Sequence, residues 1–366
     1  MLATPDIKSP VIQYDRANKI TEDRYIESPE IMLQNGDVLL TKDGSTIGTV
    51  NVVRDLVGPA TVNGSIAVLT PTGELDGRYL YWFIASSYAQ SIFDRLRGGM
   101  GVPHLFQRDI NRIRMPRPPL PEQGAIADYL DHETARIDML IEEQQRLMEM
   151  LRDRRQAVIE HATATGAMAP PNDWRVATLR RIGRFITGRT PTGDPAAVFD
   201  ADGQLGWARP EDLGGRVSTS LRLSELAANQ VRTARDAVLV CCIGATVGKV
   251  GWVDGPISSN QQITAIEVAG SAKYWYYALT GSRSRLVALA VGNTIPILNN
   301  ARLAELVIAV PPIAEQHRIA AYLDRTLSKI DTLIAETERF IQLSKERRSA
   351  LITAAVTGQI DVREME

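Results

Sequence analysis

The chain has few of the residues that most often build reactive or membrane-spanning structures. Its 366 residues include two cysteines, four histidines and 6% aromatic residues. No apolar run approaches the roughly 20 residues that a membrane helix needs, and the first residues lack the basic start and apolar stretch of a signal peptide. Cys241 and Cys242 are neighbours. Adjacent cysteines rarely form a structural bridge, so we expect two reduced, mostly buried thiols in a cytoplasmic protein that does not associate with membranes.

Sequence patterns that indicate catalysis are also scarce. The histidines are scattered and two adjacent cysteines make no metal-ligand set. The segment GATVGK (residues 244–249) has three residues between its glycines instead of four, and Val250 stands where a Ser or Thr would bind magnesium. We therefore interpret it as a tight turn between strands, and we expect no catalytic site, metal or cofactor in this chain. A nucleotide-dependent enzyme that uses Lys249 is the weaker alternative.

What the chain does contain is a long internal repeat. Residues 119–141 read PLPEQGAIADYLDHETARIDMLI, and residues 312–334 read PIAEQHRIAAYLDRTLSKIDTLI. The shift between the copies is 193 residues throughout, and Arg155 still matches Arg348. A repeat of this length indicates two copies of one unit, a globular part followed by a helix. The sequence therefore predicts internal two-fold pseudosymmetry.

Each copy of the repeat leads into a long helical pattern. Neither glycine nor proline occurs in residues 125–165 or 313–357, and each pattern ends at a Thr–Gly pair that can cap a helix. Apolar residues with a mean spacing of 3.5 predict a coiled-coil seam. Polar residues interrupt both patterns at matching places, so we expect the two helices to pair with each other in antiparallel orientation. The predicted seam residues are Ile126, Leu130, Ile137, Leu140, Leu147, Leu151, Ile319, Leu323, Ile330, Leu333, Phe340 and Leu351.

The globular parts repeat more weakly. LLTKDGSTIGTV (residues 39–50) matches LVCCIGATVGKV (residues 239–250), which predicts a strand, a glycine turn and a second strand in each. We expect an α+β protein of two mixed α/β lobes joined by the helices. The predicted domains are residues 1–118, 119–166, 167–311 and 312–366. The first lobe has no counterpart of WRVATLRRIGRFITGRTPTG (residues 174–193), so about one or two strands are missing from it.

The charge distribution points to a polyanionic partner for the lobes. The formal charge is 0 for residues 1–118, −5 for 119–167, +4 for 168–311 and −1 for 312–366. Neutral to basic lobes suit nucleic acid and acidic helices suit protein partners, although chance variation of surface charge fits equally well.

Some loop residues are of the types that bind DNA. Arg, Asn and Gln make paired hydrogen bonds to base edges, while Lys and Arg hold phosphates. For each residue alone, a solvated loop side chain or a turn cap is the simpler interpretation, and Asn63, Gln261 and Gln262 could be buried instead. The candidate DNA-binding residues are Lys42, Arg97, His104, Gln107, Arg108, Arg189, Thr190, Arg209, Lys249, Asn293, Thr294, Asn299 and Asn300, beside a basic run of Arg112, Arg114 and Arg117.

The duplicated PP-x-x-EQ-x-x-I-A-x-YLD leader, the I-D-x-L-I helix and the Gly-Asp-Val-Leu-Leu…Gly-x-Thr-x-Gly turn resemble the specificity subunit of Type I restriction–modification systems. The resemblance covers essentially the whole chain. It implies two target-recognition domains that each read one half of a split site in double-stranded DNA, and an antiparallel helix pair that sets the gap. It also implies two adenine methyltransferase subunits that carry S-adenosylmethionine and flip the target adenine, and a restriction subunit that can join them. This chain would be the non-catalytic subunit.

Two questions stay open from the sequence. The short first lobe departs from the family pattern, so either a separate short chain supplies the missing strands or this domain is degenerate. A coiled-coil adaptor whose lobes bind protein is the rival function. If the helices act as a ruler, a one-turn insertion near Gln144 and Gln145 should lengthen the recognised spacer.

Overall fold

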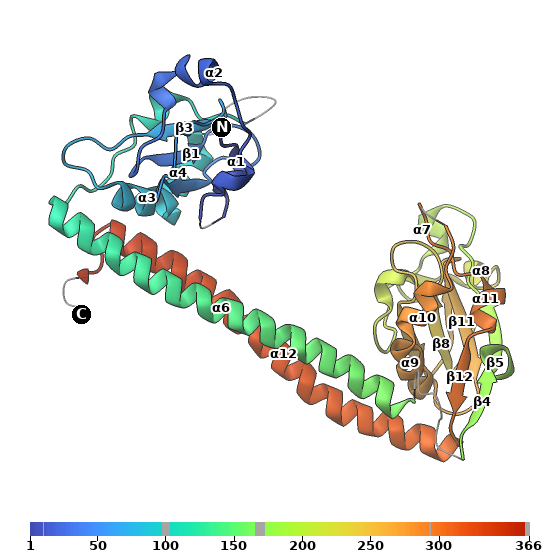
Figure 1. Cartoon of the computed structure of the whole chain (residues 1–366). Coiled ribbons are helices and arrows are strands. Elements are labelled where there is room, and N and C mark those ends of the chain that lie inside the picture. The colour runs from blue at the N-terminus through green and yellow to red at the C-terminus, as the bar shows by residue number, and fades with distance from the viewer. Residues whose placement is uncertain (10, 97–102, 165–172, 293, 363–366) are drawn as a thin grey trace. The chain divides into compact units, whose positions relative to one another are not determined.

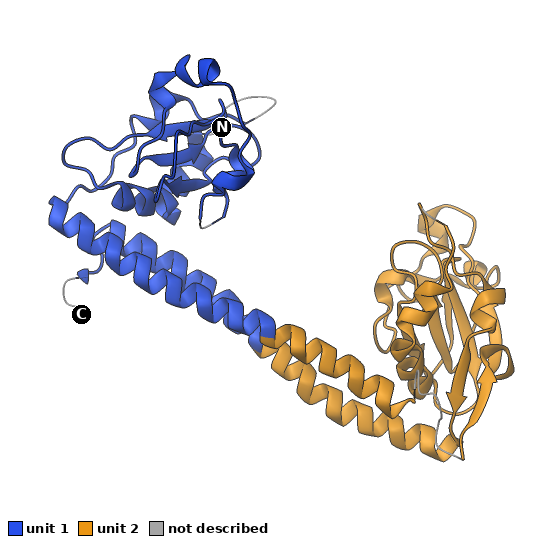
Figure 2. Ribbon diagram, viewed as in Figure 1, with its two compact units in different colours: residues 1–146, 337–366 blue, residues 147–336 orange. Residues whose placement is uncertain are grey.

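The computed structural model describes residues 1–9, 11–96, 103–164, 173–292 and 294–362 (Figure 1). The chain divides into two compact units, one of residues 1–146 and 337–366 and the other of residues 147–336 (Figure 2). Each unit therefore combines one lobe with part of both long helices. None of the helices in the described ranges has the length and apolar character to span a membrane.

The lobe of the first unit is a small antiparallel sheet covered by two helices. The sheet order is β2-β1-β3. The central strand β1 is buried at every residue, and Tyr79 and Phe83 of α3 pack against its Val38 and Leu40. Its elements are α1 (Thr4–Ile7), α2 (Glu22–Ile26), β1 (Val38–Thr41), β2 (Val50–Val52), β3 (Ile66–Leu69), α3 (Gly77–Ala85), α4 (Ser87–Leu96) and α5 (Gln107–Ile110), with 3-10 turns η1 (Tyr14–Arg16) and η2 (Pro29–Ile31).

The lobe of the second unit repeats this sheet and adds strands to it. The main sheet has the order β5-β11-β8-β9, and smaller sheets have the orders β10-β6-β7 and β12-β4. Helix α9 packs its Tyr274 and Trp275 onto the main sheet. Its elements are β4 (Arg175–Thr178), η3 (Leu179–Arg181), β5 (Gly183–Thr187), α7 (Pro195–Val198), β6 (Leu205–Ala208), η4 (Pro210–Asp212), β7 (Arg222–Leu223), α8 (Glu225–Ala228), β8 (Ala237–Cys241), β9 (Val250–Val253), β10 (Ile257–Ser259), β11 (Ile263–Val268), α9 (Ala272–Gly281), α10 (Arg283–Ala288), α11 (Asn300–Ala304) and β12 (Val307–Val310).

The long helices are α6 (Leu120–Ala162) and α12 (Ile313–Val356), and they run antiparallel. In the first unit, Arg348 Nε lies 2.9 Å from Asp138 Oδ1. In the second unit, Arg155 Nε lies 2.7 Å from Asp331 Oδ1. The 193-residue repeat relates Asp138 to Asp331 and Arg155 to Arg348, so the two ion pairs are equivalent. This confirms the predicted antiparallel pairing and pseudosymmetry.

The predicted seam needs a correction. Ile126, Leu130, Ile137, Ile319, Leu323 and Ile330 are buried as expected, and Leu151 and Leu351 are half-buried. Four predicted seam residues are instead 38–48% exposed: Leu140, Leu147, Leu333 and Phe340.

Two of the buried positions are one residue farther along the helix, Ile141 after Leu140 and Ile341 after Phe340, and Thr134 and Thr337 are buried as well. The prediction followed apolar side chains, so it passed over Thr134 and treated Thr337 as a polar interruption of the seam, although both are buried.

Buried glutamines explain why the EQ leader occurs twice. Gln123 is fully buried; its Oε1 accepts from the Asp76 backbone N at 2.8 Å, and its Nε2 donates to the carbonyl oxygens of Glu74 (2.9 Å) and Pro118 (2.8 Å). One side chain therefore ties the start of α3, the preceding loop and the start of α6 together. We call it the glutamine clamp.

The second unit has the same clamp. Gln316 Oε1 accepts from the Ser271 backbone N at 3.2 Å, and Nε2 donates to Pro311 O at 3.1 Å. Ser271 caps α9 as Asp76 caps α3.

The aspartates of the YLD motif hold the lobe helices against the long helices. Asp131 accepts from Trp82 Nε1 at 3.1 Å and pairs with Arg54 at 2.9 Å. Asp324 accepts from Tyr277 Oη at 2.7 Å and pairs with Lys273. The motif therefore fixes how each lobe sits on its own part of the helix pair.

The two cysteines are free and buried. Burial is the main reason why the pKa of the Cys242 thiol rises to about 11. The Cys241 side chain is fully buried and the raised pKa of Cys242 disfavours its reactive thiolate, so we expect neither cysteine to react with Ellman's reagent in the folded chain at mildly alkaline pH, and both to react in denaturant. Rapid reaction of the folded chain would contradict this packing.

Candidate nucleic-acid interface

A glycine turn closes the central hairpin of each lobe. Gly44 and Gly48 in the first lobe, and Gly244 and Gly248 in the second, have φ between +80° and +92°. Residues other than glycine rarely adopt a backbone conformation with positive φ. Gly248 N donates to Cys241 O at 2.9 Å. The segment 244–249 is therefore a hairpin turn.

Lys249 has a structural role in that turn. Its ammonium donates to Pro210 O at 2.9 Å and to Glu211 O at 3.1 Å, and so holds η4 against the hairpin. The alternative of a nucleotide-dependent enzyme therefore has no support from this loop. Among the described residues, no three His, Cys, Asp or Glu side chains cluster as metal ligands would.

Other loops gather beside the glycine turn in the same way in both lobes. In the first lobe, Leu105 N donates to Lys42 O at 2.8 Å; in the second, Leu298 N donates to Cys242 O at 2.8 Å. An asparagine turn completes the group, since Asn63 Oδ1 accepts from Ser65 N, and Asn260 Oδ1 accepts from Gln262 N. We call this group the loop rim. It comprises residues 42–49, 63–65 and 103–108 in the first lobe, and 188–190, 242–249, 260–262 and 294–300 in the second.

The loop rim of the first lobe carries an aromatic and basic cluster. His104 Nδ1 hydrogen bonds to Asp43, and the His104 ring meets the Phe106 ring edge-on at 4.6 Å. Phe106 is 43% exposed, and Arg108 Cζ lies 4.8 Å from its ring centroid. An exposed aromatic ring between His and Arg can contact a thymine methyl group in the major groove while the cation contacts a phosphate or a base edge.

The loop rim of the second lobe presents Arg189 from a fixed backbone. Arg189 N donates to Ser259 O at 2.8 Å, and Arg189 O accepts from Trp207 Nε1 at 3.2 Å. A Cβ on Gly188 would lie 2.1 Å from Asn260 O, so the strands approach closely here. Thr190 Oγ1 donates to Gln261 Oε1 at 2.6 Å, which leaves the amide nitrogen of Gln261 able to donate.

Several candidate residues have other roles. Asn299 caps α11, and Asn300 joins Thr264 (2.8 Å) to Thr187 (2.7 Å). Arg209 pairs with Glu211 at 3.0 Å. Three of the remaining candidates are exposed or partly exposed in the loop rims: Lys42, Gln107 and Thr294. The basic run near the PP junction is exposed, namely Arg112, Arg114 and Arg117, and Arg117 pairs with Glu74. Arg97 and Asn293 lie outside the described residues.

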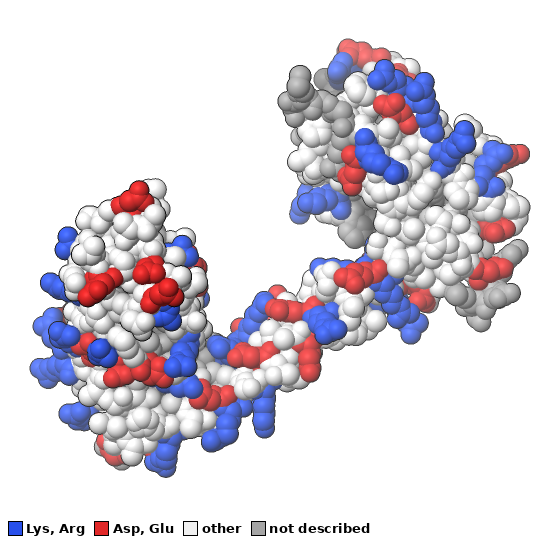
Figure 3. Space-filling view, turned by 180° about the vertical axis from the view of Figure 1, so that it is seen from behind, with Lys and Arg blue, Asp and Glu red and all other residues white. Residues whose placement is uncertain are grey.

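Phe106 was missed in the sequence analysis. A lone aromatic residue between His104 and the Gln107–Arg108 pair was the available signal, and it was overlooked because phenylalanine usually belongs to the core. Figure 3 shows basic and acidic side chains interspersed on the visible face of both lobes. Recognition would therefore depend on individually placed side chains, because the visible face does not offer one broad cationic surface.

Comparison with known proteins agrees with this picture. A family model described as the Type I restriction modification DNA specificity domain matches residues 3–149 and 171–339. The EcoBI specificity subunit of Escherichia coli is 34% identical over 112 residues, which span 30% of this chain and 24% of that protein. The EcoDI subunit of Escherichia coli is 23% identical over 52% of this chain and 39% of its own length. The chain thus aligns with well under half of these two relatives.

Longer matches exist at lower identity. The MjaVIII specificity subunit of Methanocaldococcus jannaschii is 22% identical, over 93% of this chain and 83% of that protein. Among solved structures, a chain from a study of complex assembly in the type I R-M system has a TM-score of 0.77 at 17% identity, covering 90% of this chain and 83% of that one. The HsdS subunit from Thermoanaerobacter tengcongensis has a TM-score of 0.55 at 17% identity, covering 90% and 82%. These structures establish the shared fold. Because the family model matches both repeats, the chain belongs to the Type I restriction modification DNA specificity domain family.

Proposed function

We propose that this chain is the DNA-recognition subunit of a Type I restriction–modification complex. The observation that carries the proposal is that one chain holds two lobes with equivalent loop rims, each fixed by an equivalent glutamine clamp to the same helix pair. Two such lobes suit a split site in double-stranded DNA, with one half read by each rim. The chain would act in the cytoplasm without a cofactor of its own and without catalysis, and S-adenosylmethionine would be bound by its methyltransferase partners.

Exposed apolar side chains on the long helices support protein partners. Three pairs related by the repeat are all exposed: Leu140 and Leu333 (40% and 48%), Leu147 and Phe340 (38% and 43%), and Met150 and Leu343 (60% and 52%). Exposed apolar groups that recur in both copies favour two equivalent docking sites. Two adenine methyltransferase subunits would occupy them, and a restriction subunit could join this assembly.

The first test is to co-express the chain with a candidate adenine methyltransferase and map methylated adenines across the host genome. A new split motif with a fixed gap is the expected result. Methylation that follows no motif, or a stable complex that shows no DNA binding at any salt concentration, would refute the proposal and favour the adaptor. Affinity should fall steeply with salt, because phosphate contacts release counterions.

Arg189→Ala should relax one half of the motif and leave the other half unchanged. Loss of a paired contact to a base typically costs about 1–3 kcal/mol of discrimination. The matched control is Arg184→Ala, since Arg184 lies on β5, which ends two residues before Arg189, and pairs with Glu267 at 2.7 Å. The measurement is the methylated DNA motif of each variant. Identical motifs for Arg189→Ala and the parent chain would show that Arg189 does not contact bases.

Leu140→Glu should remove one methyltransferase subunit, and Leu333→Glu the other. Each substitution places a charge on an exposed apolar position, so the fold should persist while the docking surface is lost. Native mass spectrometry should show one bound methyltransferase in place of two. Gln145→Glu, at an exposed polar position on the same helix, serves as the control. Two bound subunits in either leucine variant would show that these residues lie outside the docking surface.

A further inference from the structure

A cavity lies in the first unit where its lobe meets the long helices. It has a volume of about 480 Å³, and residues of β2, α3, α6 and α12 line it. A space of this size suits a small ligand or one large side chain. We call it the junction cavity. Its lining includes Val52, Tyr81, Trp82, Asp131, Thr134 and Asp138.

The second unit has an indole ring at the equivalent of one wall of this cavity. Val52 pairs with Val38 between β2 and β1, and Trp252 pairs with Val238 between β9 and β8, so the two residues occupy the same place in matching hairpins. Trp252 is half-buried and packs against the main apolar core of its unit. Where the second unit places an indole side chain of its own, the first unit therefore has only the small side chain of Val52.

A second wall differs in the same direction. Thr134 of α6 lines the junction cavity, and the 193-residue repeat relates it to Leu327 of α12. Both residues are buried, and Leu327 belongs to the same apolar core against which Trp252 packs. Larger side chains in the second unit thus stand at the positions whose smaller side chains border the cavity in the first. Since protein interiors are normally close-packed, this difference marks the space that the first unit leaves unfilled.

The surroundings of Trp252 show which chemistry accompanies the ring. Lys273 Nζ lies 5.2 Å from the centroid of the Trp252 ring, a favourable position for a cation, and Lys273 also pairs with Asp324 of the YLD motif. The repeat puts Arg78 at the place of Lys273, and Arg78 Nη1 lies 3.6 Å from Asp131 Oδ2. Asp131 lines the junction cavity, so the first unit keeps the cation and the carboxylate that stand beside the indole in the second.

The aromatic wall of the junction cavity is held in place. Trp82 Nε1 donates to Asp131 Oδ1 at 3.1 Å, and the rings of Tyr81 and Trp82 meet edge-on with their centroids 4.7 Å apart. Asp138, which is half-exposed, lines the cavity and could accept the N–H of a bound indole. Fixed aromatic rings favour an aromatic ligand through edge-to-face and offset contacts.

The cavity adjoins an apolar part of the α6 surface. Ala135 and Asp138 line the cavity, and Met139 lies on the same face of the helix, four residues after Ala135. Met139 is 61% exposed. The repeat places polar Ser328 and Thr332 at the positions of Ala135 and Met139. The first unit thus combines the unfilled cavity with an exposed apolar side chain, an arrangement that favours contact with another protein.

We propose that the junction cavity binds the indole ring of a tryptophan side chain that a partner protein presents. The ring would take the place in the first unit that Trp252 takes in the second, and neighbouring apolar groups of the partner would cover Met139. The inference goes beyond the proposed function, because it concerns a site whose lining residues differ between the two units. Its test needs no DNA.

The test is a fluorine NMR titration of the full chain with 5-fluoroindole. We expect saturable binding with a Kd on the order of 0.1–1 mM, because a ligand of about ten non-hydrogen atoms gains only modest affinity. Val52→Trp should weaken binding by about tenfold or more, since the new side chain fills the cavity. Thr134→Leu introduces the smaller side chain of the second unit and should weaken binding about threefold or more, in case Val52→Trp does not fold.

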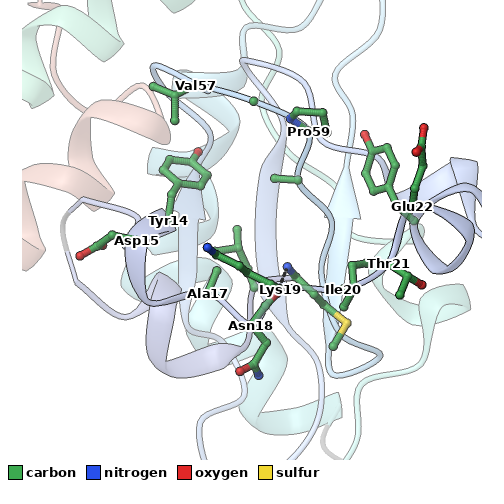
Figure 4. A pocket seen from close by; sticks show the side chains of 15 residues that line it. Tyr14, Asp15, Ala17, Asn18, Lys19, Ile20, Thr21, Glu22, Val57 and Pro59 are labelled. Carbon is green, nitrogen blue, oxygen red and sulfur yellow. Dashed lines mark hydrogen bonds between the residues drawn. The ribbon is translucent and has the colours of Figure 1, made fainter.

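Val57→Trp is the matched control. Val57 is 89% exposed and lines a neighbouring cavity of about 730 Å³, shown in Figure 4. Tyr14 lines both cavities, so the two spaces are adjacent. The same substitution at this exposed position should leave the affinity for 5-fluoroindole within about twofold of the parent chain. If Val57→Trp blocked binding while Val52→Trp did not, the ligand would occupy the neighbouring cavity and the proposal would fail.

The second unit offers the reverse experiment. Trp252→Val should open an equivalent cavity there, and the chain should then bind a second molecule of 5-fluoroindole, since a space left by a large side chain can bind an aromatic ligand. Circular dichroism checks that the variant is folded. A folded Trp252→Val variant that binds no second molecule would contradict the equivalence of the two places.

Competition identifies the source of the ring. N-acetyl-tryptophanamide carries the indole on a peptide-like backbone and should displace 5-fluoroindole. Displacement by free indole alone would assign the cavity to a small molecule and overturn the protein partner. A concentration-dependent dimer that Val52→Trp abolishes would make a second copy of the chain the donor, with the same consequence. No binding at about 5 mM 5-fluoroindole, or binding that survives both filling variants, would remove the site itself.

Discussion

Three heptads inserted into both long helices should lengthen the gap between the recognised half-sites by about 9 base pairs, with the half-site letters unchanged. The Asp138–Arg348 ion pair places Gln144 opposite Gln342, so insertions after Gln144 and after Ile341 face each other. Twenty-one helical residues add about 31 Å, close to one turn of DNA. Both lobes would then meet the same side of the duplex again.

A single heptad in both helices is the matched control. It adds about 10 Å, or roughly 3 base pairs, which would turn one half-site by about a third of a turn relative to the other. We expect a loss of DNA affinity of more than 100-fold. An insertion into α6 alone, as first considered from the sequence, would also break the antiparallel pairing. Methylated-adenine mapping measures the gap, and an unchanged gap after three heptads would show that the helices do not set it.

Gln123→Leu should destabilise the first unit by about 2–4 kcal/mol and lower its melting temperature by roughly 5–15 °C. The substitution removes three hydrogen bonds of a fully buried side chain and leaves the carbonyl oxygens of Glu74 and Pro118 without their donor. Calorimetry should show the shift in the first unit. Gln316→Leu removes two hydrogen bonds and should lower the melting temperature of the second unit instead.

Gln145→Leu controls for the change of side chain, because Gln145 is exposed on the same helix. It should change the melting temperature by no more than about 1–2 °C, as surface substitutions usually do. If Gln123→Leu were as mild as Gln145→Leu, the clamp would not hold the lobe on the helix, and the duplicated EQ motif would need another explanation.

The sequence predicted the features that depend on the repeat. The antiparallel helix pair, the pseudosymmetry and the hairpin turns all followed from matching residues at constant spacing. The helical seam was partly wrong, because buried Thr134 and Thr337 occupy core positions that a search for apolar residues passes over. Leu140 and Leu333 are correspondingly exposed.

The site was harder to predict than the fold. Lys249 and Asn300 have the right chemistry for DNA, but their hydrogen bonds to η4 and to Thr187 and Thr264 appear only when distant strands are brought together. Arg189 could be singled out because it follows a glycine. Its fixed backbone depends on Ser259 and Trp207, which lie at least 18 residues away.

The spacing between equivalent residues shows where the two copies of the repeat differ in length. Thr41 and Cys241 are 200 residues apart, Asn63 and Asn260 are 197, Tyr79 and Tyr274 are 195, and Gln123 and Gln316 are 193. The changes of length between these positions thus lie within the lobes, and none lies between the glutamine clamps and the ion pairs of the helices. Natural selection could therefore diversify the loop rims freely while the frame that positions them stayed constant, and new specificities would arise without a redesign of the assembly.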